Sequence, residues 1–376
     1  MGSDTLTTPT AGTAERGPVS RPEQVDPQAI VVSHWFDPGD QGDPYSAIVR
    51  LTGRRRGVTD RPTPGDSFTK DEAVEGIVPG TGPIAVTSWV YGVRKGEWDV
   101  TAQLTGPAMA HGAGPRKVRG GAAARLPRAA WSWRRWSLSG GPTGPVETRW
   151  ALLAPLARSP AVLPGAFTAL AVLAIILAIV VQAALLARLS VPVGGGVLAS
   201  VAALLAGLLG AKLWYVALKG GPWQAALGQG WTVDGFLVVA PIVAVLFVLA
   251  LGLPVGTYLD ATAPGLFLAV AIGRVGCFVT GCCAGRCTAS RWGVWSSDRR
   301  VGARRIPAQL IESGIGLALG MASALALLGG IAGHDGLVFV VALIGYAIAR
   351  QWLLRLRAES RRYSWQRSRL ATQAGS

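Results

Sequence analysis

The sequence predicts an all-α multi-pass membrane bundle of about six transmembrane helices, preceded by a small all-β, sandwich-like domain. Half of the 376 residues are hydrophobic and only 15% are charged, which excludes an ordinary soluble enzyme. From about residue 160, apolar stretches of roughly twenty residues follow one another, and this length spans a bilayer. Residues 29–105 instead combine β-branched and aromatic residues with Gly, Pro and Asp turns, a pattern typical of short strands.

The N-terminal part divides into three regions. Residues 1–28 are rich in Thr, Ala, Gly, Pro and charge and are expected to form a disordered tail. In the β module, 29–105, strands are expected at residues 29–32, 46–51, 84–91 and 98–102. The run from Val90 to Val100 resembles the closing hairpin of a fibronectin-type or immunoglobulin-like module, which implies a β sandwich but no particular ligand.

Residues 106–158 are predicted to form a basic linker rich in Trp, Gly and Pro, with Arg134 and Arg135 lying between Trp133 and Trp136. Arginine among aromatic residues also occurs in nucleic-acid-binding segments. A segment directly before a membrane span is more typical of the bilayer surface, where Trp is favoured. We therefore expect a membrane partner and no nucleic acid, and the net charge of +15 favours anionic headgroups.

The membrane domain is predicted to cover residues 159–357 and to be followed by a basic tail at 358–376. The expected spans are 163–187, 193–218, 235–253, 263–283, 306–328 and 337–354. Two connections are longer than the others, at 217–234 and 284–305. The second is basic, and its arginines are Arg286, Arg291, Arg299, Arg300, Arg304 and Arg305.

The most informative stretch runs from Gly273 to Arg286. It places Arg274 inside the fourth predicted span and Arg286 where that helix is expected to end. A charge at bilayer depth costs about 3 kcal/mol on insertion scales and marks a functional site by default. The small residues around it allow a lipid headgroup to approach closely. The sequence therefore predicts an anion site at the membrane surface.

Polar residues also border the other predicted spans: Lys212, Asp234, Gln309, Glu312 and Arg350. Any one of them alone could snorkel to the surface or make a structural hydrogen bond. Together, Arg274, Arg286 and Arg350 flank the membrane face that carries the basic connection. Arginine forks suit bidentate phosphate contacts. Glu312 can pair with one of these arginines or act as a base, and pairing is the favoured role.

Four segments of residues 160–357 resemble the prolipoprotein diacylglyceryl transferases in order and approximate spacing: Gly210–Tyr215, Gly273–Arg286, Ile306–Glu312 and Gly345–Arg350. The resemblance implies a cell-membrane enzyme without a cofactor. Such an enzyme moves the diacylglyceryl group of phosphatidylglycerol, an anionic phospholipid, to a cysteine thiol of a lipoprotein precursor and releases glycerol phosphate.

The resemblance also implies roles for individual residues. Arg274 and Arg350 would hold the phosphate, Glu312 would order the site, and Gly276 and Gly285 would permit close approach. Further substrate contacts are implied for Lys212, Tyr215, Cys277, Cys282, Arg286 and Gln309.

The chain departs from the family pattern mainly in its acid/base residues. Asp234 follows Val233 where the family has His-Gly-Gly, and it either replaces the histidine as base or caps a surface helix. A seventh span is missing. The other departures are Cys277 for Asn, Cys282 for Glu, Leu354 for Glu, and Phe167 as the nearest match to a Tyr. The alternative is therefore a non-catalytic, anionic-lipid-binding membrane protein that presents the β module, whose ligand is unknown, to a partner.

The cysteines lie at Cys277, Cys282, Cys283 and Cys287, in the pattern C-x4-C-C-x3-C. Four thiolates can bind zinc or a cluster, but no paired C-x2-C spacing is present and two cysteines are adjacent. A cysteine acceptor or acyl-carrying nucleophile is a further alternative. The favoured interpretation is packing of small apolar side chains, with no bound metal.

Two considerations conflict over orientation. No signal peptide is visible, and with six spans both tails share a side with the connections at 217–234 and 284–305. Basic residues concentrate on that side, so the positive-inside rule places it in the cytoplasm. The family resemblance implies the reverse, with a site that opens outward to secreted precursors. We favour the cytoplasmic placement, because about 1 kcal/mol per basic residue near an anionic leaflet accumulates. The acceptor would then be a cytoplasmic thiol or another lipid.

Overall fold

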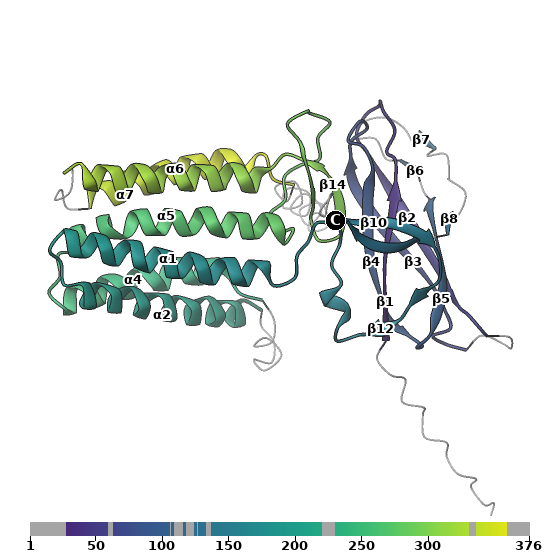
Figure 1. The fold of residues 1–376 in the computed structure, drawn as a ribbon, viewed down its shortest axis with the longest axis horizontal. Coiled ribbons are helices and arrows are strands. Elements are labelled where there is room, and N and C mark those ends of the chain that lie inside the picture. Colours follow the sequence, from purple (N-terminus) through teal and green to yellow (C-terminus); the bar gives the residue numbers. More distant parts are fainter. Residues whose placement is uncertain are drawn as a thin grey trace, which may run out of the picture.

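The computed structural model describes residues 28–58, 63–105, several short strands between 107 and 143, 144–219, 230–330 and 336–358. The predicted tails, apart from Gln28 and Ala358, lie outside the described residues. So do Trp133, Arg134, Arg135 and Trp136, and most of the connection at 217–234. Figure 1 shows a β module at one end of a bundle of long helices.

The bundle confirms the predicted membrane architecture. In the part of the chain that the structure describes, six helices are long and apolar enough to cross a membrane. Large apolar side chains such as Leu205, Ile242 and Ile348 face outward, as expected for contact with lipid. The helices are α1 Ala166–Arg188, α2 Val193–Lys219, α4 Val233–Ala250, α5 Val255–Val279, α6 Ala308–Leu328 and α7 Leu337–Leu354.

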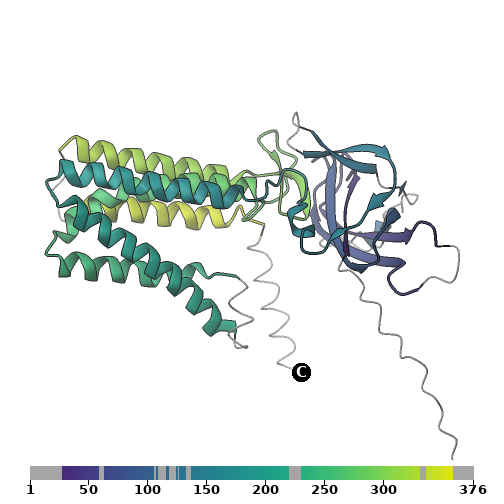
Figure 2. The same ribbon diagram turned by 60° about the horizontal axis from the view of Figure 1, so that its bottom comes forward.

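Small residues set the spacing of the helices. A side chain at Gly265 of α5 would collide with the backbone of Ala178 in α1, and one at Gly210 of α2 would meet Val239 and Gly235 of α4. Such close backbone approach is a common way of packing helices in a membrane. The α2–α4 pair diverges from the other four helices toward the end that carries the β module (Figure 2).

The β module confirms the predicted all-β domain and consists of two curled antiparallel sheets. Its long strands are β1 Gln28–Phe36, β2 Tyr45–Arg55, β3 Ser67–Ile77, β4 Ile84–Val93 and β5 Glu97–Thr105. Among the described residues, one sheet has the order β12 (Arg149–Trp150), β1, β4, β14 (Val301–Arg305), β13 (Val294–Ser297). The other has the order β11 (Val146–Glu147), β5, β2, β3, with β8 (Ala124–Arg125) beside β5. Their inner faces enclose a core that includes Ile30, Leu51 and Trp98.

Short strands occur in the range predicted as a linker. They are β6 Pro107–Ala108, β7 Arg116–Lys117, β8 Ala124–Arg125, β9 Pro127–Ser132, β10 Ser137–Thr143, β11 Val146–Glu147 and β12 Arg149–Trp150. β11 pairs with β5 and β12 pairs with β1, so the chain contributes to both sheets just before it enters the bundle.

The hairpin predicted between Val90 and Val100 is wrong. β4 pairs with β1 and β14 in one sheet, whereas β5 pairs with β2 in the other. Gly92 and Gly96 both have positive φ, 73° and 145°, and these left-handed conformations let the chain cross between the sheets. β3 was not predicted, because most of its residues are polar and exposed and only Val74 and Ile77 are buried apolar residues.

A hairpin from the bundle completes the first sheet. Strands β13 (Val294–Ser297) and β14 (Val301–Arg305) belong to the basic connection after α5, and β14 lies beside β4. The Thr87 amide donates to the Arg300 carbonyl at 2.7 Å, and the Arg300 side chain pairs with Glu72. Trp295 stacks on Trp35 of β1 with ring centroids 5.5 Å apart. The β module is therefore fixed to the helix ends by continuous sheet pairing (Figure 1).

Candidate functional site: a glutamate–arginine cluster at the helix ends

The C-terminal ends of α5 and α7 and the N-terminal end of α6 meet at the end of the bundle that faces the β module (Figure 1). α5 ends at Val279, earlier than the predicted boundary near 283. The reason is local, because Gly281 and Cys283 take left-handed conformations with φ of 67° and 55°, which a helix cannot continue. Arg286 therefore lies in a loop beyond the helix rather than at its end.

Glu312, in the first turns of α6, is the centre of the site and is fully buried. Its Oε1 forms an ion pair with Arg274 Nη2 on α5 at 3.0 Å and accepts a hydrogen bond from Arg350 Nη1 on α7 at 3.0 Å. The Tyr346 hydroxyl also donates to Oε1, at 2.7 Å. Arg357 Nη2, just after α7, donates to Oε2 at 2.5 Å. These five residues are called the Glu312 cluster below.

The Glu312 cluster carries an excess of positive charge. Arg274 and Arg350 share a single carboxylate, and in the described part of the chain neither has another acidic partner within ion-pair distance. The Arg350 side chain is 37% exposed, whereas that of Arg274 is 17% exposed. An anion can therefore reach Arg350 from the surface and meet Arg274 deeper in the bundle, with both forks already oriented by Glu312.

Arg286 adds a donor near the same loop. Its amide donates to the Leu356 carbonyl at 3.0 Å, and the Ile306 amide donates to the Arg286 carbonyl at 2.9 Å. The side-chain Nε is buried and has no hydrogen-bond partner among the described residues. The backbone pairing thus joins the segment after α5 to the segment after α7.

Three other predicted residues have packing or positioning contacts. Gln309 is buried, and its Nε2 donates to the Cys282 carbonyl at 2.9 Å. A side chain at Gly276 would press against Phe167 of α1, and one at Gly285 would collide with the Ile306 backbone. In the structure, protein atoms occupy the space that these two glycines leave open.

The predicted residues on α2 and α4 lie apart from the Glu312 cluster in their described contacts. Lys212 Nζ donates to the Gly230 carbonyl at 3.3 Å and sits 5.0 Å from the centroid of the Trp231 ring. Its distance to the Tyr215 ring centroid is 5.9 Å. Asp234 is exposed in the first turn of α4, and in the described part of the chain no hydrogen bond or ion pair links it to the cluster.

Tyr346 and Arg357 belong to the cluster but were not among the predicted site residues. Tyr346 stood in a segment that carried the family resemblance, four positions before Arg350 and thus on the same helix face. Arg357 lies just beyond the end of α7, among the arginines of a basic C-terminal region. Helical spacing could therefore have identified Tyr346 but not Arg357.

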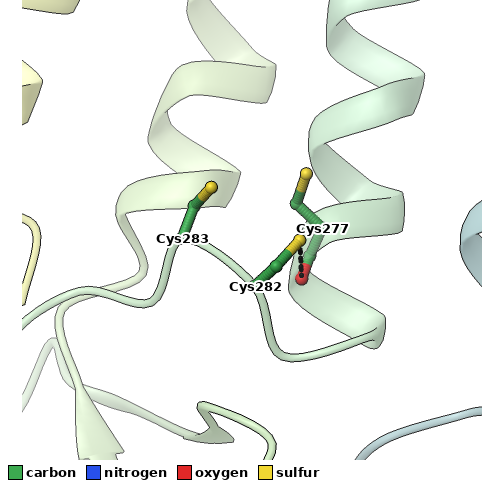
Figure 3. Close-up of side chains that lie close together, drawn as sticks. All are labelled: Cys277, Cys282 and Cys283. Carbon is green, nitrogen blue, oxygen red and sulfur yellow. Dashed lines mark hydrogen bonds between the residues drawn. The ribbon is translucent and has the colours of Figure 1, made fainter. Parts of the chain in front are cut away.

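The thiols of Cys277, Cys282 and Cys283 converge beside the cluster. All three sulfur atoms lie within 4.8 Å of one another, although the residues come from the last turn of α5 and the loop that follows it (Figure 3). Arg274 Nη1 lies 4.0 Å from Cys277 Sγ, so this guanidinium contacts both Glu312 and one of the three cysteines. Cys287 instead packs against the β-module core, and burial raises the pKa of its thiol.

Comparison with protein families gives one match. The sequence model of the family described as prolipoprotein diacylglyceryl transferase matches residues 165–374. This range contains the membrane helices and the whole Glu312 cluster. No curated protein and no solved structure matches the chain.

Proposed function

Because the chain belongs to the prolipoprotein diacylglyceryl transferase family, we propose that it moves the diacylglyceryl group of phosphatidylglycerol to the cysteine thiol of a lipoprotein precursor or another acceptor. The observation that carries this proposal is the Glu312 cluster, in which three arginines pair with one buried carboxylate. The site is therefore positively charged and oriented before any lipid arrives.

The geometry suits the chemistry of the transfer. The acceptor sulfur forms a bond to the glyceryl carbon, the carbon–oxygen bond to phosphate breaks, and glycerol phosphate leaves with the electron pair. A thiol attacks as the thiolate. Charge that develops on the departing phosphate is stabilised most by donors that are already in place. Arg350, which is partly exposed, would meet the headgroup first, and Arg274 would meet it deeper in the bundle.

One observation favours the alternative of a non-catalytic lipid-binding protein. Asp234, the candidate replacement for the family histidine, is exposed and outside the cluster in its described contacts. A binding protein needs the arginines but no acid/base residue.

Expression of the full chain in a transferase-depleted bacterial strain tests between the two functions. We expect the chain to add the mass of one diacylglyceryl group to a reporter cysteine peptide in the cytoplasm, because the acceptor is a cytoplasmic thiol in the orientation that we favour. Lipidation of an exported reporter lipoprotein would instead indicate the opposite orientation. Purified chain that binds phosphatidylglycerol vesicles but adds no mass to any cysteine peptide would contradict the enzymatic function and support the alternative. Equal membrane insertion, measured by immunoblot of the membrane fraction, is the control.

The orientation of the site decides which acceptor it meets. The β module, the β13–β14 hairpin and the segment after α7 all lie at the same end of the bundle (Figure 1). Part of the basic charge at this end is used within the protein, since Arg300 pairs with Glu72 and Arg305 pairs with Asp298. We propose that this end faces the cytoplasm, because the remaining basic residues favour the anionic inner leaflet.

Reporter fusions at Ser376 measure this orientation. We expect a bright fluorescent-protein fusion and an inactive alkaline phosphatase fusion. The opposite pair of results would place the Glu312 cluster outside the cytoplasm and make an exported lipoprotein precursor its acceptor. A second fusion pair after Arg188, the last residue of α1, should give the reverse signals and serves as the internal control.

A further inference from the structure

The last turn of α5 and the loop after it bring the thiols of three cysteines close together, although their spacing in the sequence is not that of a metal-binding motif. The Cys282 amide donates to the Cys277 carbonyl at 3.0 Å, which folds the turn back onto the helix end. The Gln309 side chain fixes the Cys282 carbonyl from α6. Cys283 has a φ of 55°, a left-handed conformation that is unfavourable for a residue with a side chain. The fold thus tolerates local strain that brings the thiols together.

We propose that Cys277, Cys282 and Cys283 form a three-thiolate zinc site whose fourth position is open to the acceptor thiol. A tetrahedral zinc with Zn–S bonds of about 2.3 Å separates its sulfurs by roughly 3.8 Å. The three sulfurs already lie within 4.8 Å of one another, so small side-chain rotations suffice. All three cysteines are free thiols in the structure.

The number of ligands indicates an open rather than a closed site. Structural zinc sites have four protein ligands, whereas catalytic sites have three and leave one position for water or substrate. The fourth cysteine, Cys287, forms an isolated backbone β-bridge with Arg305, and its side chain packs against the β-module core. Among the described residues, no other histidine, cysteine or carboxylate joins the three thiols as a metal-binding group.

A positive side chain beside the three cysteines suits the charge of a zinc–thiolate site. Three thiolates and one Zn²⁺ carry a net negative charge, which is costly to bury without a counter-charge. The Arg274 guanidinium lies 4.0 Å from Cys277 Sγ and provides that counter-charge. The same guanidinium contacts Glu312, so the zinc site would adjoin the positive cluster that is proposed to hold the phosphate.

The zinc would supply an activation for which the described residues offer no histidine near the Glu312 cluster. The described residues include a single histidine, His34 in β1, far along the chain from the Glu312 cluster. A thiol that coordinates zinc loses its proton outright. The acceptor would release its proton to solvent on binding, and its sulfur would then displace glycerol phosphate from the glyceryl carbon without any change of oxidation state. This role rests on the proposed transferase function, whereas the metal site itself does not.

Elemental analysis of the full chain, purified in detergent without chelator, tests the metal site without turnover. We expect about one zinc per chain, removed by a chelator and restored by added zinc. Cobalt(II) in its place should show sulfur charge-transfer absorption and the visible bands of a tetrahedral thiolate site. The variants Cys277→Ser, Cys282→Ser and Cys283→Ser should each lose the metal, whereas the matched control Cys287→Ser should keep it.

The outcomes separate this inference from the proposed function. Wild-type chain that holds neither zinc nor cobalt, or that forms a disulfide within the trio in reducing buffer, would overturn the site. A short peptide with one cysteine should shift the cobalt spectrum, and an unchanged spectrum would overturn the open fourth position. Bound metal with a shifted spectrum in a chain that fails the lipidation assay would leave the site standing and reject the transferase function. The melting temperature of each variant is the control: a variant that loses the metal but stays folded has lost a ligand, whereas an unfolded variant is uninformative about ligation and is replaced by the cobalt spectrum of the wild-type chain.

Discussion

The variant Glu312→Ala is expected to lower the free energy of unfolding by about 3–5 kcal/mol. Glu312 is fully buried, forms an ion pair with Arg274 on α5, and accepts hydrogen bonds from three residues on or directly after α7, namely Tyr346, Arg350 and Arg357. Its removal leaves positive charges in the bundle without their carboxylate, which costs more than a lost neutral hydrogen bond. Thermal unfolding of the purified chain in detergent measures the effect.

Matched variants separate charge from packing in this prediction. Ser313→Ala on the same helix removes one hydrogen bond, to the Ala271 carbonyl, and should cost only about 1 kcal/mol. The variant Glu312→Gln keeps the shape but loses the charge, and adding Arg357→Gln should recover part of its stability. If the Glu312→Ala variant unfolds at the same temperature as the wild-type chain, the cluster does not hold the helix ends together.

The variants Arg274→Ala and Arg350→Ala are each expected to reduce lipid turnover by a factor of at least about 10². Each removes a guanidinium that is proposed to hold the phosphate. Each also leaves Glu312 with other arginine partners, so the protein should still fold and insert. Lysine at either position keeps the charge but loses the bidentate geometry, and only partial activity should return. The lipidation assay with immunoblot of the membrane fraction measures both quantities.

The control for these variants is Arg188→Ala. Arg188 ends α1 at the opposite end of the bundle and is exposed, so its loss should leave turnover unchanged. Full activity in both Arg274→Ala and Arg350→Ala would remove the phosphate-site hypothesis. A loss of activity that is fully explained by a smaller amount of the variant in the membrane fraction would also count against this hypothesis.

The sequence predicted the bundle well, because apolar runs of membrane-spanning length are visible without any tertiary information. It also drew attention to Arg274, Glu312 and Arg350, since charged residues inside such runs are conspicuous, and the structure brings these three side chains together. It placed the start of the fourth span too late. Asp260 lies inside α5 and interrupts the apolar run, but its Oδ1 accepts a 3.0 Å hydrogen bond from the Phe339 amide at the start of α7.

Other features depended on contacts that sequence patterns do not encode. Arg357 belongs to a run of basic residues that resembles an orientation signal, and only the fold shows that it is buried against Glu312. The three cysteines lack the spacing of a chelating turn, and they converge because Gly281 and Cys283 reverse the chain. The pairing of β14 with β4 joins residues more than two hundred positions apart. Such long-range pairing leaves no local signal.

That pairing has a consequence for the order of events during synthesis. The ribosome makes β4 first, and α1, α2, α4 and α5 all lie between it and β14. Until the hairpin after α5 has emerged, the edge of β4 presents unpaired amides and carbonyls, which are prone to pair with other chains. The β module therefore reaches its final state only after these helices have been made. A chain truncated before Val294 would keep this edge of β4 open and should aggregate through it.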